Sequence, residues 1–301
     1  MSSPWIEALR SVALVVPDVE AATRFYTDTW KLDIAARADG AVYLRGTGRD
    51  HHLLSLHPGP RAALRTVTLR ARSAQALDEI SRAALEAGGT LITPIGQVNE
   101  PGGGVGLTIR DMDGCIFQVV HGDECHADAH ETPDRPIRLA HVVLNAHALP
   151  VAQAFLENAL KFRLSDRTRI MAFMNCDHDH HSIALGDTDN DALNHIAFLM
   201  PDVHSVMRGG GRMRDAGYSI DWGPGRHGPG NNAFNYFVGP DGVVIEYTAE
   251  VEQIDSTYKV GGPEDWTWPP GRVDQWEISQ PPSARLKEAQ RAIEFIKESF
   301  Q

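Results

Sequence analysis

Two stretches of the chain share one pattern: LRSVALVVPDVEAATRFYTDTWKL begins at Leu9, and LAHVVLNAHALPVAQAFLENALKF begins at Leu139. Each reads as a short apolar strand, a turn and an amphipathic helix with apolar residues at helical spacing. The apolar residues of the two helices are Ala22, Phe25 and Tyr26 in the first, and Val151, Ala154, Phe155 and Leu156 in the second. The chain therefore contains an internal repeat, and the repeated unit decides the fold class.

The repeat continues beyond these two stretches. RDHHLLSLH at Arg49 matches HDHHSIALG at His178, ALRTVTL at Ala63 matches ALNHIAF at Ala192, and DMDGCIFQVV at Asp111 matches GPDGVVIEYT at Gly239. Three matches in the same order and at nearly the same spacing indicate a duplication. We predict that residues 1–130 and 136–250 are two copies of one domain. The linker between them is the stretch Glu124–Pro136, which is rich in His, Asp and Pro.

Each copy reads as α+β. The strands are short, alternate in polarity and end at Gly, Pro or Asp turns. Helices are predicted over Ala74–Ala87 and Val203–Ala216, because each segment is followed at once by a glycine.

Residues 251–301 lie outside the repeat and form a Trp- and Pro-rich arm, with a helix predicted from about Ser283 to Glu298. Tryptophans in such an arm usually anchor it on the body of a protein. Trp266, Trp268 and Trp276 could cover the second copy or contribute to a subunit interface.

Composition excludes several classes of protein. The chain has 301 residues, 42% of them hydrophobic and 23% charged, as in a soluble two-domain protein. Its net charge of −12 argues against nucleic acid and anionic membranes as partners. Met1 to Arg10 lacks the pattern of a secretory signal, and no apolar window is long enough for a membrane span. The three scattered cysteines form no disulfide framework, so we expect a cytoplasmic protein.

The two copies differ at three strand positions. Our alignment places His141 opposite Val12, His195 opposite Thr66, and Glu246 opposite Gln118. His141 and His195 are 54 positions apart, as are Val12 and Thr66. The second copy thus has two imidazoles and a carboxylate where the first copy has poor ligands or none. Two His and one carboxylate leave positions open on a metal, as in non-haem iron(II) oxygenases. Zinc with the same ligands would favour hydrolysis or a lyase reaction.

Residues 8–250 resemble the type I extradiol ring-cleavage dioxygenases, which belong to the vicinal oxygen chelate superfamily. The resemblance is most specific in LAHVVLNA, HHSIALGDTDNDALNHIAF and GPGRHGPGNNAFNYFVGPDGVVIEY. It implies two tandem domains, each of paired βαβββ modules, in which the C-terminal sheet curls around the metal and the N-terminal domain lacks metal ligands. The chain departs from the family pattern at Gly239 and in the length of its arm, and the second departure leaves the substrate range open.

The resemblance also implies roles for single residues. His141, His195 and Glu246 would bind Fe(II), or alternatively Mn(II). His181, in HHSIAL, corresponds to the family's acid/base histidine, and the adjacent His180 is expected to be a structural or outward-facing neighbour. In addition, His227 of GRHG corresponds to a histidine behind the ligands, and Tyr236 of NAFNYF to the tyrosine that hydrogen-bonds substrate. The first copy also has a His pair, at His51 and His52, so part of the motif could be inherited structure.

The activity implied is O₂-dependent cleavage of the ring of a catechol-type diol in aromatic catabolism, by an enzyme that we expect to form a homo-oligomer. Two alternatives from the same superfamily stay open: a glyoxalase-like metal-dependent lyase or isomerase, and a metal-free binding protein of the bleomycin-resistance kind. The diol itself is open, and candidates include alkylated, biaryl and carboxylated catechols. Arg167, Arg169 or Arg226 could hold a substrate carboxylate.

Overall fold

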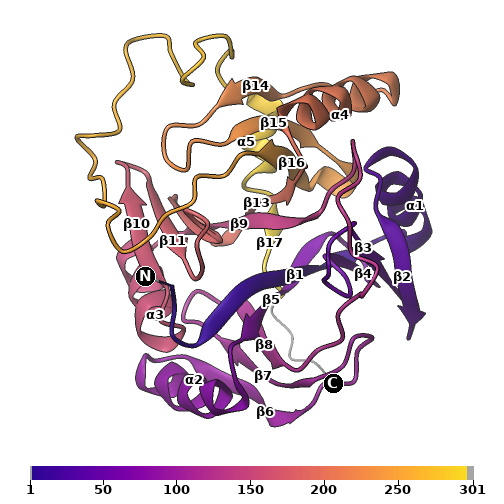
Figure 1. Cartoon of the computed structure of the whole chain (residues 1–301), viewed down its shortest axis with the longest axis vertical. Helices are drawn as coiled ribbons and strands as arrows, with labels where there is room; N and C mark the ends of the chain where they lie inside the picture. The colour runs from indigo at the N-terminus through magenta and orange to yellow at the C-terminus, as the bar shows by residue number, and fades with distance from the viewer. Residues whose placement is uncertain (1, 297–301) are drawn as a thin grey trace.

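The fold is a pair of sheets with identical strand order. The computed structural model describes residues 2–296. The first sheet runs β2-β3-β4-β1-β5-β8-β7-β6, and the second runs β10-β11-β12-β9-β13-β16-β15-β14, with β17 paired to β13 off this path. In Figure 1 the first sheet is indigo to purple in the lower and right part of the molecule, and the second is pink to yellow above it.

The first sheet and its helices use residues 6–121. In chain order they are β1 (Ile6–Val16), α1 (Val19–Arg24), η1 (Phe25–Thr29), β2 (Asp33–Ala38), β3 (Ala41–Arg45), β4 (Leu54–Pro58), β5 (Ala63–Ala71), α2 (Ala74–Glu86), β6 (Thr90–Gln97), β7 (Val105–Arg110) and β8 (Ile116–His121).

The second sheet repeats the series and adds a C-terminal extension. Its elements are β9 (Arg138–Ala146), α3 (Leu149–Ala159), β10 (Arg163–Arg167), β11 (Met171–Asn175), β12 (Ile183–Asp187), β13 (Ala192–Leu199), α4 (Val203–Asp215), β14 (Trp222–Arg226), β15 (Ala233–Val238), η2 (Pro240–Gly242), β16 (Val244–Ala249), α5 (Ala284–Ala289) and β17 (Ile293–Glu294).

Each sheet consists of two βαβββ modules. In the first, β1 pairs in parallel with β4, β5 pairs in parallel with β8, and the antiparallel pair β1–β5 joins the modules. The second sheet repeats these pairings with β9–β12, β13–β16 and β9–β13. The expected α+β fold of paired βαβββ modules is confirmed.

The helices of the second module of each domain were correctly predicted from their boundaries. α2 begins after Ser73, whose side chain accepts a hydrogen bond from the backbone N–H of Ala76, and Gly88 follows the helix at φ +88°. A left-handed residue of this kind ends a helix with little strain only when it is glycine. Leu77 and Ile80 form part of the buried face of α2.

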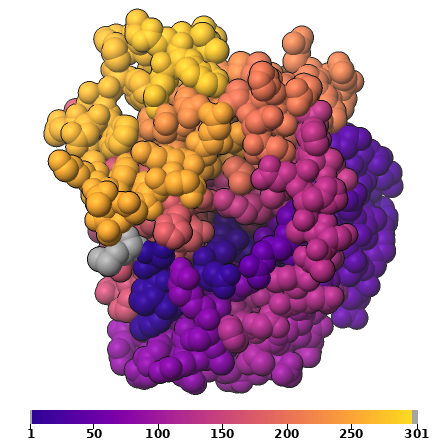
Figure 2. All heavy atoms as spheres, in the orientation of Figure 1, coloured from indigo at the N-terminus to yellow at the C-terminus, as the bar shows by residue number. Residues whose placement is uncertain are grey.

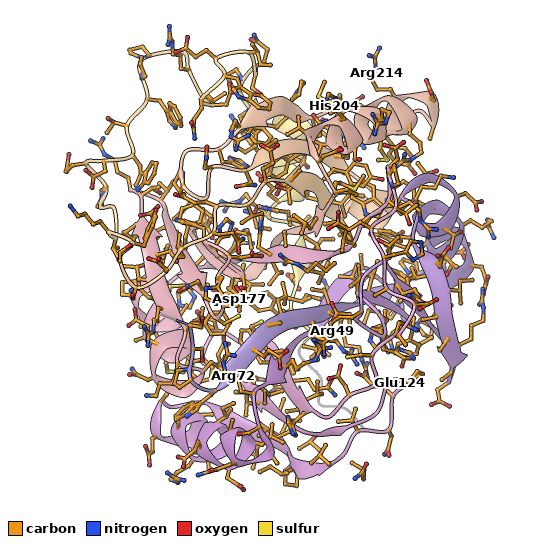
Figure 3. All side chains as sticks on the ribbon, in the orientation of Figure 1. Arg49, Arg72, Glu124, Asp177, His204 and Arg214 are labelled. Atoms are coloured by element: carbon orange, nitrogen blue, oxygen red, sulfur yellow. The ribbon has the colours of Figure 1, made fainter. Side chains whose placement is uncertain are left out.

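The two sheets are held together at their junction. Arg72, labelled in Figure 3, donates from Nε to the carbonyl oxygen of Ser3 at 2.7 Å and from Nη2 to that of Cys176 at 3.5 Å. Phe117 of β8 and Phe155 of α3 stack in the shared core at a centroid distance of 6.4 Å. The two halves therefore pack as parts of one body.

The C-terminal arm packs on the second sheet. In Figure 2 its gold spheres lie over the upper left of the molecule. A Cβ at Gly228 would lie 3.0 Å from the ring of Trp268 and 3.2 Å from that of Trp266, so both rings lie against that loop. The guanidinium of Arg226 lies 5.8 Å from the ring centre of Trp276. All three tryptophans thus contact the segment around residue 227.

The predicted helix from Ser283 to Glu298 is wrong in its second half, of which residues 297 and 298 lie outside the described part of the chain. α5 ends at Ala289, and Ile293 and Glu294 then pair with β13. The sequence keeps its helical spacing there, but the buried strand pairing of Ile293 overrides local propensity.

The register of the first sheet corrects one alignment. β1 pairs Ala13 with Thr66, whereas β9 pairs Val143 with His195. Ser11 therefore occupies the place of His141, and Val12 lies in the apolar core. The equal spacing of 54 positions was misleading. The structurally equivalent pair Ser11 and Thr66 is 55 positions apart, one more than His141 and His195.

No helix among residues 2–296 has the length and apolar character needed to cross a membrane.

Candidate metal centre and active-site pocket

Three neighbouring strands bring the predicted ligands to one face of the second sheet. His141 lies on β9, His195 on β13 and Glu246 on β16. Ala197 of β13 pairs with His141 on one side and Glu246 on the other, and His195 shares its face because alternate strand residues point the same way. The methyl side chain of Ala197 leaves room for the two flanking groups to converge.

The ligand atoms lie within contact of one another. Glu246 Oε2 lies 3.2 Å from His141 Nε2 and 3.3 Å from His195 Nε2, and the two Nε2 atoms are 3.4 Å apart. Atoms bonded to one ion at about 2.1 Å have separations of this size. All three side chains are buried, and a divalent ion bound by all three would replace the contacts that they make with one another. The residues present therefore fit a divalent metal.

The neighbours of the ligands set their orientation. His195 Nδ1 lies 2.8 Å from Asn194 Oδ1 and, as the donor, leaves Nε2 with its lone pair toward the other ligands. Asn232 Nδ2 lies 3.5 Å from Glu246 Oε1 and donates to Thr248 Oγ1 at 2.7 Å. The Nδ1 atom of His141 has no hydrogen-bond partner among the described residues.

Electrostatic interactions among the three groups shift the pKa of Glu246 and of His195. Burial raises the pKa of Glu246, but the adjacent His141 and His195 outweigh burial and hold this pKa below its usual range. Burial lowers the pKa of His195, and Glu246 opposes that shift only in part. The pair therefore favours an ionised carboxylate and a neutral imidazole, which are the forms that bind metal.

His181 stands beside the triad at the end of a hydrogen-bonded chain. Its ring centre lies 4.3 Å from that of His141. His181 Nδ1 is 3.1 Å from His180 Nδ1, and His180 Nε2 is 2.8 Å from Asp166 Oδ2. Since the carboxylate accepts from His180 Nε2, His180 Nδ1 must accept from His181 Nδ1–H, which leaves His181 Nε2 as the basic nitrogen. Burial, His141 and His180 lower the pKa of His181 well below its usual value, so the ring is neutral.

His227 and Tyr236 complete the opposite wall. The Tyr236 hydroxyl lies 3.0 Å from His227 Nε2 and 3.4 Å from His195 Nε2. Burial and Glu246 raise the pKa of Tyr236 well above its usual value, so the phenol remains a donor. Burial lowers the pKa of His227 to about 4. The indole of Trp222 lies 5.1 Å from the His227 ring and 5.0 Å from the Tyr236 ring, centre to centre.

These groups line a cavity of about 360 Å³. His141, His195, His181, His227 and Tyr236 all contribute to it, and Glu246 lies behind them. Its remaining wall is largely apolar and includes Val143, Ile170, Met171, Phe173, Trp222 and Pro282. The structure thus brings together all six residues that the sequence singled out.

The arginines considered as carboxylate binders do not line this cavity. Arg226 donates to Glu250 at 2.6 Å and to Asn231 at 3.0 Å. Arg167 donates to the carbonyl oxygen of Thr168 at 2.8 Å and lies 3.9 Å from the carboxylate of Asp187, and Arg169 is exposed. The only formally charged carboxylate among the described lining residues is Asp187.

Sequence reasoning expected His180 to be a structural or outward-facing neighbour of His181 and missed Asp166, the partner of His180. Asp166 and His180 are fully buried, and His180 does not face outward. The available signal was the repeat itself, because His51 and His52 have the same contact at 3.0 Å. Nothing in the local sequence around Asp166 marks it as a partner of His180.

The chain was compared with known proteins. A family model described as Glyoxalase/Bleomycin resistance protein/Dioxygenase superfamily matches residues 8–119 and 138–247. The chain is 37% identical over 139 residues to metapyrocatechase 2 of Cupriavidus necator, a match that covers 45% of this chain and 41% of that one. The chain thus matches less than half the length of this curated relative. It is 24% identical over 253 residues to a manganese-dependent 2,3-dihydroxybiphenyl 1,2-dioxygenase of Geobacillus genomosp. 3, covering 76% of this chain and 80% of that one.

Solved structures give a longer match. The Mn(II)-bound glyoxalase from Novosphingobium aromaticivorans superposes with a TM-score of 0.88 at 30% identity, over 100% of this chain and 98% of that one. An extradiol ring-cleaving dioxygenase from Brevibacterium fuscum superposes with a TM-score of 0.79 at 22% identity, over 94% and 88% of the two chains, and this likeness concerns the fold. Both copies of the repeat are matched, and the chain belongs to the Glyoxalase/Bleomycin resistance protein/Dioxygenase superfamily.

Proposed function

We propose that this protein is a metal-dependent extradiol dioxygenase, which opens the ring of an aromatic diol and adds both atoms of O₂. The observation that carries the proposal is the convergence of His141, His195 and Glu246 within 3.4 Å of one another, at the wall of a cavity that also holds His181. The relatives named metapyrocatechase and 2,3-dihydroxybiphenyl dioxygenase support it.

Fe(II) is the metal we favour, with Mn(II) as the alternative. Two imidazoles and one carboxylate on one face of the metal are typical of non-haem Fe(II) oxygenases. Relatives described as manganese-dependent and as Mn(II)-bound support the alternative. When bound, such an ion would acidify the diol and let electrons pass from it to O₂.

His181 is proposed as the residue that moves protons. Its Nδ1–H is engaged with His180, so Nε2 would accept a proton from the second hydroxyl of the diol. The same Nε2 would later return the proton to a reacting oxygen as the O–O bond breaks, so that both oxygen atoms stay in the ring-opened product. A neutral histidine suits this role, and burial keeps His181 neutral.

Tyr236 and His227 are proposed to orient the substrate. The Tyr236 hydroxyl stays protonated and can donate a hydrogen bond to a substrate oxygen near His195. His227 Nε2 lies 3.0 Å from that hydroxyl and fixes its direction. Such groups contribute by holding the reacting atoms in place.

The wall of the cavity indicates a diol with an apolar substituent. Phe173, Met171 and Trp222 provide apolar contact, and the described lining residues include no arginine or lysine that would pair with a carboxylated side chain. We therefore propose alkyl- or aryl-substituted catechols rather than carboxylated ones.

A glyoxalase-like lyase or isomerase is the second candidate. The solved relative that covers the whole chain at 30% identity is described as a glyoxalase, which favours it. Such a reaction consumes no O₂, so oxygen uptake separates the two candidates.

The test is an oxygen-electrode assay of protein loaded anaerobically with Fe(II), given catechol, 3-methylcatechol and 2,3-dihydroxybiphenyl in turn. The proposal expects O₂ uptake and a yellow product with at least one diol, and none with His195→Ala. Stable metal binding without uptake from any diol would favour the lyase or isomerase.

Two wider expectations stay predictions. We propose a homo-oligomer, because the arm exposes apolar side chains at Trp268, Trp276 and Ile278, and light scattering would test it. A cytoplasmic location fits the three free cysteines.

A further inference from the structure

The first domain holds a pocket in the place that the metal pocket occupies in the second. The strand pairings put Ser11, Thr66 and Gln118 where the second domain has His141, His195 and Glu246. All three side chains line a cavity of about 670 Å³. The first domain thus has a cavity at the same place, with hydroxyl and amide groups, which bind divalent metals poorly, at the positions of the ligands.

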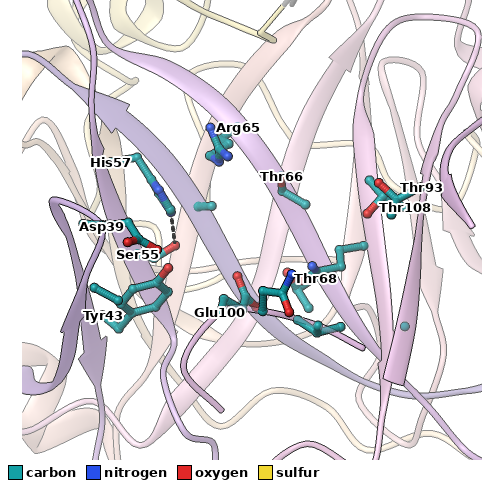
Figure 4. A pocket seen from close by; sticks show the side chains of 18 of the residues that line it. Asp39, Tyr43, Ser55, His57, Arg65, Thr66, Thr68, Thr93, Glu100 and Thr108 are labelled. Atoms are coloured by element: carbon teal, nitrogen blue, oxygen red, sulfur yellow. Dashed lines mark hydrogen bonds between the residues drawn. The ribbon is translucent and has the colours of Figure 1, made fainter. Parts of the chain in front are cut away.

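The wall of the first pocket is also more polar than that of the metal pocket. Thr93 pairs with Thr108 in the first sheet as Trp222 pairs with Tyr236 in the second. The aromatic wall of the metal pocket is therefore replaced by two threonines. Figure 4 shows Thr66, Thr68, Thr93, Thr108 and Ser55 around the first pocket, a lining suited to a polar ligand and unsuited to an apolar ring.

This pocket also carries charges of both signs. Arg65 comes from β5, and Glu100 comes from the loop after β6 (Figure 4). Glu100 Oε1 is buried and accepts no hydrogen bond within the described residues, although it lies 3.4 Å from Arg10 Nη1. Arg10 thus compensates the charge of Glu100, and a ligand that donates to Oε1 would complete the hydrogen bonding of this atom.

The first pocket is not arranged for the proposed proton transfer. His52, the equivalent of His181, has its Nε2 atom 2.6 Å from Arg10 Nη1, and that arginine is fully buried. A guanidinium can only donate, so it occupies the lone pair that His181 keeps for substrate. The second domain has Ala140 in the place of Arg10. Binding, rather than catalysis, is what these residues support.

We propose that the N-terminal pocket is a second, metal-independent binding site for small carboxylic acids that also carry hydroxyl or amino groups. Arg65 would receive the carboxylate, because guanidinium groups pair with carboxylates in two-point contacts. Glu100 would accept from the hydroxyl or ammonium group, and the threonine and serine hydroxyls would bind the remainder. An amine without a carboxylate, or a neutral polyol, would use only part of these contacts.

The test is isothermal titration calorimetry of the metal-loaded full chain with lactate, malate, glycine, serine and glutamine as probes. Ethanolamine and glycerol serve as matched probes that lack the carboxylate. Saturable binding of at least one acid is expected, with weaker binding of both matched probes. The absence of saturable binding by every acid, or equal binding of ethanolamine, would overturn the proposal.

Variants locate the binding. Arg65→Gln is expected to weaken it about tenfold to a hundredfold, as for loss of a charge-assisted hydrogen bond. Arg61→Gln is the control, because Arg61 is exposed and pairs with Glu294 outside the pocket. Thr93→Trp is a second variant, in case Arg65→Gln fails to fold. The substitution is at an exposed position, fills the pocket and should abolish binding. Binding that survives these substitutions would lie outside this pocket and would contradict the proposal, whatever the outcome for dioxygenase activity.

Discussion

His180 Nε2 lies 2.8 Å from Asp166 Oδ2, and both side chains are fully buried. This contact determines which nitrogen of His180 faces His181, and through it which nitrogen of His181 is basic. The carboxylate also accepts from the Tyr258 hydroxyl at 2.9 Å and from the Gly261 N–H at 2.6 Å, so the arm holds it in place. The arm thereby contributes to the proposed catalytic machinery without lining the cavity at that point.

Asp166→Asn should lower kcat by about tenfold to a hundredfold while metal content stays at one ion per chain, because the substitution removes the charge that fixes the tautomer of His180. Tyr258→Phe is the matched control, since it removes one hydrogen bond to Asp166 and leaves the imidazole contact. The pH profile of kcat should change in Asp166→Asn and not in Tyr258→Phe. Identical profiles in both variants would reduce Asp166 to a structural residue.

His181→Ala should bind metal as the wild type does and lose about a hundredfold or more of turnover, as expected for loss of a general acid–base. The measurement pairs metal analysis with O₂ uptake under saturating diol. His204→Ala, at an exposed position on α4 labelled in Figure 3, is the control and should keep full activity. Full turnover in His181→Ala would remove it from the mechanism.

Substrate choice should follow the wall of the cavity. The wild-type kcat/KM is expected to be at least about tenfold higher for an alkyl- or aryl-substituted catechol than for one with a carboxylated side chain, given the apolar wall and Asp187. Asp187→Asn should narrow that ratio several-fold, because it removes a negative charge from the cavity wall and leaves Arg167, now 3.9 Å from Asp187, without that carboxylate. A wild-type preference for the carboxylated catechol would contradict the proposed substrate class.

Asp111 makes stability depend on pH. Burial, followed by the nearby Asp113, raises the pKa of Asp111 from 3.8 to about 7 in the folded protein. Between these values the folded state holds a proton that the unfolded chain has lost, so this group destabilises the fold as pH rises from about 4 to about 7.

Asp111→Asn keeps an acceptor for the N–H of Cys115, which Asp111 now binds at 2.8 Å. Relative to wild type, the free energy of unfolding of this variant should rise by about 1 kcal/mol or more across that window and change little above it. Denaturant unfolding at several pH values measures the difference, with Asp215→Asn as a surface control on α4. A constant difference at all pH values would show that Asp111 titrates normally.

Much of the fold was predictable because the repeat supplied each element twice. The positions of the three candidate ligands, His141, His195 and Glu246, were predictable because the second copy differs from the first at strand positions of matching order. His181, His227 and Tyr236 were singled out by the family resemblance, and their roles stay predictions. The sequence alignment wrongly placed Val12 opposite His141, where the strand register places Ser11. Spacing alone could not show this, because the first copy has one more residue between the two strands. The end of α5 was missed because pairing of Ile293 with β13 is a tertiary contact.

The relay behind His181 and the polar pocket of the first domain could not be predicted for a related reason. Asp166 and His180 are 14 positions apart and share no motif that we noted in the sequence. Their contact depends on how β10 and the loop before β12 pack. The first pocket contains ordinary threonines and serines, and only their shared face gives them meaning.

Whether the protein is a dioxygenase is tested by a reaction of the Fe(II)-loaded protein with 2,3-dihydroxybiphenyl under ¹⁸O₂, followed by mass spectrometry of the product. We expect consumption of one O₂ per diol and a ring-opened product whose mass equals that of the diol plus both labelled atoms, with no product from His195→Ala. An unchanged diol, or O₂ reduced to peroxide without incorporation, would contradict it.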